Sequence, residues 1–439
     1  MVGLSVLFRS VLLASFTLVS LLAATGCAVK SGENIGASGA RSPSRAAVFV
    51  VQPDAQGRDA AVGLDAAAFA GRAGAADYIL IGEGHTVACD HGVQARLLEI
   101  LARTCRPPAL GLEMIGADRQ EILDRFFNTS GAGAPVRAAA ATLAALANDL
   151  DWPQTWGHSF ELYAPIFRVA LAARLPVYGL NIPPKVMAAF RKSGVGGLSA
   201  EQKKFLPRQV VPPAEAQKKA LGEEFERHAA MMRSKKSAEK TVASGLGALK
   251  SPAGQAEARE RFFHVQSLWD SKMAERAVEV RQATGRPVVV LAGAAHVENG
   301  WGIAHRLRTL DPHARVLLIA PWRGGKLPGV DNADVFFFCA DEHKSRLGFT
   351  VEWREDAPSG AVAVVTSVAP GTRADKAGLA EHDAIVAAGG KPLAGLADLH
   401  VAAIQAKTAG KNLALTLLRS GKRLEVVLDL SAEAGPAGP

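Results

Sequence analysis

Several familiar motifs are missing from this sequence of 439 residues. There is no G-x-x-x-x-G-K-[ST] loop, which excludes a P-loop nucleotide site, and no G-x-S-x-G turn, which excludes the nucleophile elbow of serine hydrolases. The absence of H-E-x-x-H and of C-x-x-C-H excludes a zincin-type protease and covalently attached c-type haem. Beyond the N-terminal segment, no apolar run is long enough to span a membrane.

Positive charge is not concentrated in any one stretch either. The net charge is +8, but no basic stripe is interleaved with aromatic residues, so the sequence does not predict a nucleic-acid partner. The content of 49% hydrophobic and 21% charged residues is typical of a folded globular protein. The length predicts two or three domains.

Cysteine is scarce, with four in the chain, and the first of them ends an export signal. Arg9 precedes an apolar run over residues 11–22, and small residues lead from there to Cys27. Residues 24–27 (ATGC) resemble a bacterial lipobox, which implies lipid on Cys27; ordinary signal cleavage with a free Cys27 is the alternative. Because Ala28 follows rather than Asp, the resemblance implies a lipoprotein of the bacterial outer membrane, facing the periplasm or the cell surface.

Three cysteines remain after the signal, namely Cys89, Cys105 and Cys339. An odd number in an oxidising compartment predicts at least one unpaired thiol. We do not expect a bridge between Cys89 and Cys105, because about twelve helical residues between them rise ~18 Å, whereas bridged Cα atoms lie within roughly 7 Å.

The composition divides the chain into six parts. Ser, Gly and charged residues dominate the stretch after Cys27, and "GGKLPGVDNAD" reads as a linker. We expect a signal peptide over 1–26, a flexible tether over 27–46, a first domain over 47–323 with a helical insertion over 191–261, a linker over 324–335, a second domain over 336–431 and a disordered tail over 432–439.

Apolar runs recur through the first domain before Gly or polar residues, and amphipathic helical segments separate them. Such strands alternating with helices predict an α/β fold with a mostly parallel sheet covered on both faces. The runs occupy residues 78–81, 109–112, 177–180, 288–291 and 316–319.

Two of these runs end in similar turns. LIGEGH over residues 80–85 matches LAGAAH over residues 291–296, and each is followed by a helical segment and a further strand. A duplicated strand–GxxH–helix unit explains the match; chance similarity of two glycine-containing turns is the alternative.

The first turn does not carry a dinucleotide fingerprint, because Val87 stands where the third glycine is required. Both turns instead place a histidine, His85 or His296, just past the end of a strand, and Glu113 ends the next strand. Since ligands of open α/β sheets bind at this edge, we expect the three side chains to face one cavity. Two imidazoles and a carboxylate could hold a divalent metal or perform acid–base chemistry; hydrogen-bonded loop residues are the alternative.

The order of further motifs resembles the ChaN family of haem-binding lipoproteins, which shares a superfamily with Tiki proteases and erythromycin esterases. The resemblance begins with Gly82-Glu83-x-His85, His91 and Gln94 and covers roughly residues 75–322. It continues through LDWPQTWGHSFELYAPIF, PVYGLNIP, FFHVQSLWDSKMAERA and AGAAHVENGWGIAHRL.

This resemblance implies haem as a cofactor and a part in haem and iron uptake. It suggests Tyr163, His85, His91 and His296 as cofactor-binding residues. Tyr163, one of only three tyrosines, is the preferred axial ligand at the mouth of a pocket. An ordinary helix-packing tyrosine is the alternative.

The Tiki branch of the superfamily implies a different activity, metal-dependent peptide hydrolysis. In that case His85, Glu113 and His296 would be the catalytic and metal-binding residues, with Mn, Co or Zn as the metal. His228, Met231 and Met232 lie at helical spacing in the insertion and could close over a ligand; a solvated cap helix is the alternative.

The C-terminal part resembles a bacterial PDZ domain, which is small and rich in β-strands. Leu347, Gly348 and Phe349 occupy the place of the carboxylate-binding loop, and the strand from Phe349 would pair with a bound peptide. The expected partners are therefore haem, peptide C-termini or a membrane protein, and the membrane through the lipid; a second copy of the chain is a further candidate.

Overall fold

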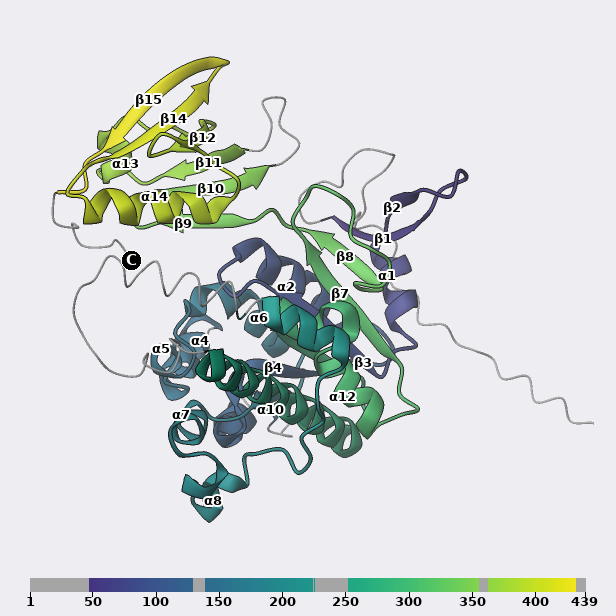
Figure 1. Cartoon of the computed structure of the whole chain (residues 1–439). Helices are drawn as coiled ribbons and strands as arrows, with labels where there is room; N and C mark the ends of the chain where they lie inside the picture. The colour runs from purple at the N-terminus through teal and green to yellow at the C-terminus, as the bar shows by residue number, and fades with distance from the viewer. Residues whose placement is uncertain (1–46, 129–138, 224, 226–251, 355–361, 432–439) are drawn as a thin grey trace, which may run out of the picture.

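The computed structural model describes residues 47–128, 139–223, 225, 252–354 and 362–431. It contains two sheets, one in each predicted domain (Figure 1). Cys27, the tether, the C-terminal tail, and His228, Met231 and Met232 lie outside the described residues. Within the described part of the chain, no helix has both the length and the apolar character needed to cross a membrane.

The first sheet has eight strands in the order β2-β1-β8-β7-β3-β6-β4-β5. The six strands from β8 to β5 are parallel, and β1 and β2 form an antiparallel edge, so the predicted mostly parallel sheet is confirmed. The strands are β1 (Val48–Pro53), β2 (Asp59–Gly63), β3 (Tyr78–Glu83), β4 (Ala109–Gly116), β5 (Val177–Asn181), β6 (Val288–Gly293), β7 (Val316–Trp322) and β8 (Val335–Phe338).

Helices cover both faces of this sheet because its central strands are apolar on both sides. Ile79 and Ile81 of β3 join a core with the helices around α2 and α6, whereas Tyr78 and Leu80 join a core with α10 and α12. The helices are α1 (Ala66–Ala73), α2 (Ala88–Ala102), α3 (Gln120–Leu123), α4 (Ala139–Asp149), α5 (Trp152–Thr155), α6 (Phe160–Ala172), α7 (Pro184–Ser193), α8 (Ala200–Lys203), α10 (Pro252–Thr284), α11 (Ala294–Val297) and α12 (Ile303–Leu310).

The duplicated unit predicted from the two GxxH turns is present. One copy runs β3–α2–β4, and the other runs β6–α11–α12–β7. The insertion predicted over 191–261 does not end where expected. Helix α10 begins within it, at Pro252, and continues to Thr284 as a long helix of the first domain.

The second sheet forms the PDZ domain, with the order β15-β14-β12-β11-β10-β9 and β13 paired to β12. Phe349, Val351, Ile385, Leu399 and Leu415 lie in its core. The elements are β9 (Glu342–Ser345), β10 (Phe349–Arg354), β11 (Val362–Val368), α13 (Arg373–Lys376), β12 (Ala384–Ala388), β13 (Lys391–Pro392), α14 (Leu396–Thr408), β14 (Leu413–Arg419) and β15 (Lys422–Leu428).

The boundary between the linker and the second domain, predicted between residues 335 and 336, falls inside strand β8. This strand pairs with β7 and β1, so it belongs to the first sheet. Phe336 and Phe337 are buried in the two cores on opposite sides of that sheet. The described PDZ strands therefore begin with β9 at Glu342.

A disulfide joins Cys89, at the start of α2, to Cys339, just after β8. Its Cα atoms are 5.8 Å apart, and it links positions separated by 250 residues. The expectation that Cys89 does not pair with Cys105 is thus confirmed. No described cysteine is free, so the expected unpaired thiol is not found among the described residues.

We expect the double variant Cys89→Ser/Cys339→Ser to lower the free energy of unfolding by about 2–5 kcal/mol, because the bridge constrains a long loop of the unfolded chain. Denaturant unfolding followed by circular dichroism measures the difference. Each single variant should lose about as much as the double variant, since each breaks the same bond. Wild-type stability in the double variant would contradict the expectation.

Candidate functional site

The candidate site lies at the C-terminal ends of β3, β6 and β4, which are neighbours in the sheet. Glu83 ends β3, Glu113 lies near the end of β4, and His296 lies on α11 directly after β6. The chain crosses from β3 to β4 in one direction and from β6 to β7 in the other. Ligands of open α/β sheets bind where successive crossovers diverge in this way.

Glu83 is the centre of one half of the site. Its buried carboxylate accepts a hydrogen bond from the Tyr163 hydroxyl (2.6 Å) and contacts Nδ1 of His85 (2.9 Å) and Nδ1 of His91 (3.4 Å). Burial alone would raise the pKa of Glu83, but the contacts with His85, His91 and Tyr163 outweigh it and lower the pKa to about 2. Glu83 is therefore a fixed negative charge at neutral pH.

The structure does not support Tyr163 as an axial ligand at a pocket mouth. Its side chain is only 1% exposed, and its hydroxyl is held between Glu83 and the indole N–H of Trp156, which donates over 3.1 Å. Burial and the negative charge of Glu83 both raise the pKa of Tyr163, which opposes formation of the tyrosinate. The expected place at a pocket mouth is therefore not found, because α6 turns the hydroxyl inward. The role of Tyr163 as a haem ligand stays a prediction.

His91 is likewise buried, and not a surface ligand. Its ring packs against Tyr163 with centroids 4.3 Å apart, and its Nε2 lies 3.3 Å from the carbonyl oxygen of His85. Together with its Glu83 contact, this makes His91 a support for the turn that carries His85.

His296 and Glu113 form the second half of the site. Nε2 of His296 lies 3.5 Å from Glu113, and its Nδ1 lies 2.6 Å from Asp270 of α10. Burial would lower the pKa of His296, but the carboxylates of Glu113 and Asp270 outweigh burial and raise it to about 9. Asp270 is itself held by Gln217, whose side-chain amide donates over 3.0 Å, and by fully buried Arg306 at 3.4 Å.

Gly293 joins the two halves. A Cβ atom at this position would lie 2.9 Å from Cε1 of His85 and 3.6 Å from an oxygen of Glu113, so only glycine leaves room for the imidazole. The Gly293 N–H also donates to Glu113 over 2.6 Å. His85, Glu113 and His296 thus converge as the sequence predicts.

This convergence does not make a metal site. Among the described residues, no group of three or more His, Cys, Asp or Glu side chains is placed to hold a metal ion. Both nitrogens of His296 face carboxylates, and one oxygen of Glu113 accepts the Gly293 N–H. The alternative of a Mn, Co or Zn hydrolase therefore gains no support from the structure.

His85 is the predicted residue that retains an open nitrogen. Its side chain is 32% exposed, and no described residue hydrogen-bonds to its Nε2. Its ring packs edge-on against Trp156 (4.9 Å) and lies 5.5 Å from the ring of His158. Burial would lower the pKa of His85, but Glu83 and Glu113 outweigh it and raise the pKa.

Sequence reasoning did not select four residues of this site: Glu83, His158, Asp270 and Arg306. All four lie inside segments that carry the ChaN resemblance, but neither spacing nor charge singled them out. Burial and the neighbouring His85 lower the pKa of His158, which keeps its imidazole neutral at pH 7.

We expect His296 to titrate with a pKa of about 9 and to titrate lower in Asp270→Asn and in Glu113→Gln, because each variant removes a negative charge beside the ring. Histidine-selective isotope labelling and NMR titration measure this. The pKa of His296 in the folded protein exceeds the unfolded value of about 6.5, so protonated His296 adds to the free energy of unfolding. This contribution is fully present below about pH 6.5 and is lost as the pH rises through about 9. Asp311→Asn, a matched change beside Tyr78, should leave the His296 titration unchanged.

Comparisons with solved structures find distant likenesses. A structure described as cofacial heme binding to ChaN of Campylobacter jejuni has 16% identity and a TM-score of 0.46, covering 66% of this chain and 96% of that chain. The erythromycin esterase EreC in its open conformation has 16% identity and a TM-score of 0.30, covering 71% and 82%. The type III effector HopBA1 has 11% identity and a TM-score of 0.35, covering 63% and 93%. These likenesses are too distant to carry an argument about function, and no curated protein matches the chain.

Family models give a direct assignment. Residues 345–430 match the PDZ domain. Residues 69–307 match the family described as haem-binding uptake, Tiki superfamily, ChaN. Because this second match covers more than half of the chain, the protein belongs to the haem-binding uptake family ChaN of the Tiki superfamily.

Proposed function

We propose that this chain binds haem through His85 as part of haem uptake, while anchored by lipid on Cys27 to the bacterial outer membrane. The observation that carries the proposal is the state of the His85 imidazole. Glu83 holds its Nδ1, no described residue hydrogen-bonds to its Nε2, and its side chain is partly exposed. Membership of the ChaN family supplies the ligand class.

The residues present fit haem better than a bare metal ion. A haem iron already has its porphyrin nitrogens and needs one or two axial ligands from the protein, so a cluster of three ligands is not required. When bound, haem would supply an iron centre and a flat apolar macrocycle. His85 would hold the iron, and the rings of Trp156 and His158 beside it would contact the macrocycle.

The partial exposure of the His85 side chain, 32%, favours binding against an open face. A porphyrin bound at His85 would keep one face uncovered, and a second copy of the chain is the candidate partner for that face.

The PDZ domain adds recognition of a peptide or partner protein to this function. Such domains bind an extended peptide as an additional strand, with the backbone of the preceding loop holding the carboxylate. Leu347, Gly348 and Phe349 lie at the turn between β9 and β10, which is the position required for that loop. Cys27 on a tether would keep both domains close to the membrane.

Titration of the full chain with hemin should give a saturable Soret shift. We expect His85→Ala to weaken hemin binding roughly tenfold or more, which corresponds to about 1.4 kcal/mol, because it removes the axial nitrogen. Tyr163→Phe should keep the shift, since the hydroxyl is turned into the protein.

His313→Ala is the matched control for that titration, because His313 is exposed and lies just before β7, at the opposite end of the sheet. No Soret shift in the wild-type chain would refute haem binding. A shift lost in Tyr163→Phe but kept in His85→Ala would refute the assignment of the ligand.

Cys27→Ser should move the protein from the membrane fraction to the soluble periplasmic fraction, because a serine cannot accept the lipid. Cell fractionation and immunoblotting measure the distribution. Ala28→Ser, a matched change one residue later, should leave the protein with the membranes. Persistence of Cys27→Ser in the membrane fraction would contradict lipid anchoring at this residue.

A further inference from the structure

The edge of β10, which the PDZ resemblance assigns to a bound peptide, already carries a strand of the same chain. Strand β9 pairs antiparallel with β10 over four positions, from Phe349 opposite Ser345 to Glu352 opposite Glu342. On its other edge β10 pairs with β11. Both edges of β10 are therefore taken, and an added peptide strand has no free backbone groups to pair with.

Strand β9 also lies against α14, the helix that faces β10. His343 of β9 and His400 of α14 have ring centroids 6.4 Å apart, and Figure 1 shows β9 running alongside α14. Phe349 of β10 and Leu399 of α14 belong to one core, which places the helix beside this edge of the sheet. The segment thus occupies the space between strand and helix where a PDZ domain receives its peptide.

We propose that β9 is an internal occupant of the PDZ peptide site and that an external peptide, extended and with a free C-terminus, binds by displacing it. The segment is suited to displacement. It pairs over four positions, whereas β14 and β15 pair over seven, and its residues are exposed or only partly buried.

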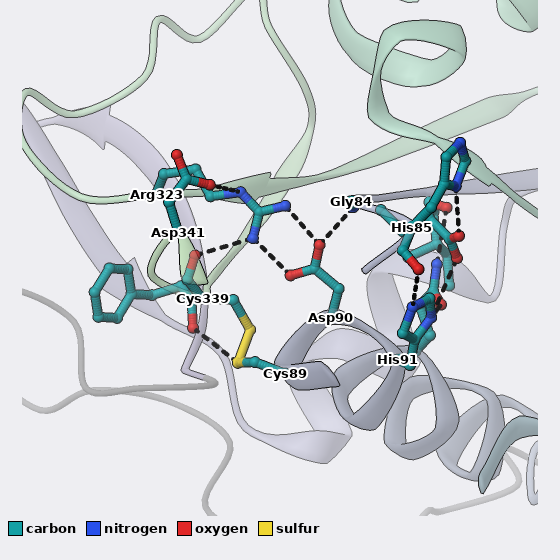
Figure 2. A network of polar contacts seen from close by, with 12 residues as sticks. Gly84, His85, Cys89, Asp90, His91, Arg323, Cys339 and Asp341 are labelled. Atoms are coloured by element: carbon teal, nitrogen blue, oxygen red, sulfur yellow. Dashed lines mark hydrogen bonds and ion pairs between the residues drawn. A yellow bond between two sulfur atoms is a disulfide. The ribbon is translucent and has the colours of Figure 1, made fainter. Parts of the chain in front are cut away.

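The base of β9 is held in place by the first domain (Figure 2). Cys339, three residues before Glu342, forms the disulfide with Cys89. Asp341, directly before the strand, lies 3.2 Å from the Arg323 guanidinium. This anchor and the three-residue turn to β10 keep β9 at a high effective concentration beside its site, on the order of millimolar, so it competes strongly with any external strand.

The residues that hold the start of β9 also contact the turn that carries His85. Arg323 donates two parallel hydrogen bonds to Asp90, and Asp90 accepts the backbone N–H of Gly84 over 2.7 Å (Figure 2). Arg323 also donates to the carbonyl oxygen of Cys339 over 3.0 Å. The segment that closes the peptide site is thus fixed to the same loop that presents the histidine.

The test compares peptide binding by the wild-type full chain and by His343→Pro, in which the proline removes a backbone donor and disfavours the β9 strand. The probe is a pool of fluorescently labelled decapeptides with free C-termini and four randomised final residues. Lys422→Pro is the matched control, because it places proline at the first residue of the edge strand β15. Fluorescence anisotropy measures binding, and hydrogen exchange of the β14 amides verifies that the domain is folded.

We expect His343→Pro to bind the pool at least about tenfold more tightly than wild type, with Lys422→Pro equal to wild type. The amides of β10 should exchange faster in His343→Pro, whereas those of β14 keep their protection. Equal binding by wild type and His343→Pro, or no binding by a folded His343→Pro, would overturn the proposal. Peptide binding is the readout, so the outcome is independent of whether the first domain binds haem.

Discussion

The arrangement of the candidate haem site depends on one buried carboxylate, Glu83. Removing a charge from water costs several kcal/mol unless hydrogen bonds replace its hydration. Here one carboxylate oxygen receives the Tyr163 hydroxyl and Nδ1 of His85, and Nδ1 of His91 lies 3.4 Å from the other oxygen. Because two imidazoles face the carboxylate, Glu83 also sets the orientation of both rings. The accessible face of His85 follows from that orientation.

The two copies of the strand–GxxH–helix unit place their histidines in different chemical surroundings. His85 has Glu83 at one nitrogen and no hydrogen-bond partner among the described residues at the other, whereas His296 has Asp270 at one nitrogen and Glu113 near the other. Neighbouring carboxylates raise the pKa of both histidines, that of His296 to about 9. The duplication therefore yields one partly exposed histidine and one buried histidine between two carboxylates, so paired GxxH turns do not give their histidines the same surroundings.

The sequence is sufficient to predict the parallel strands and the meeting of His85, Glu113 and His296, since both follow from apolar runs and from the shared edge of parallel strands. It is not sufficient to predict the burial of Tyr163, because the direction of its hydroxyl depends on how α6 packs against α2. Nor does it predict the bond between Cys89 and Cys339, since spacing along the chain says nothing about residues that lie 250 positions apart. The boundary error at β8 has a related cause: a short apolar run after a polar linker fits either domain until its pairing partner is known.

The junction between the domains explains why β9 can be both a strand of the PDZ sheet and a fixed point of the first domain. Arg323 is 24% exposed at its side chain, and it joins Asp90, Asp341 and the Cys339 carbonyl. A bidentate guanidinium–carboxylate pair is directional as well as strong, so it resists rotation better than a single contact does. The disulfide beside it resists separation. The ion pair and the disulfide together hold the start of β9. The strand can therefore detach from β10 only by bending between Asp341 and the turn at Leu347. Exchange with an external peptide would be confined to that short segment. A continuous chain of polar contacts, from Asp341 through Arg323 and Asp90, links the start of β9 to the Gly84 N–H, one residue before His85.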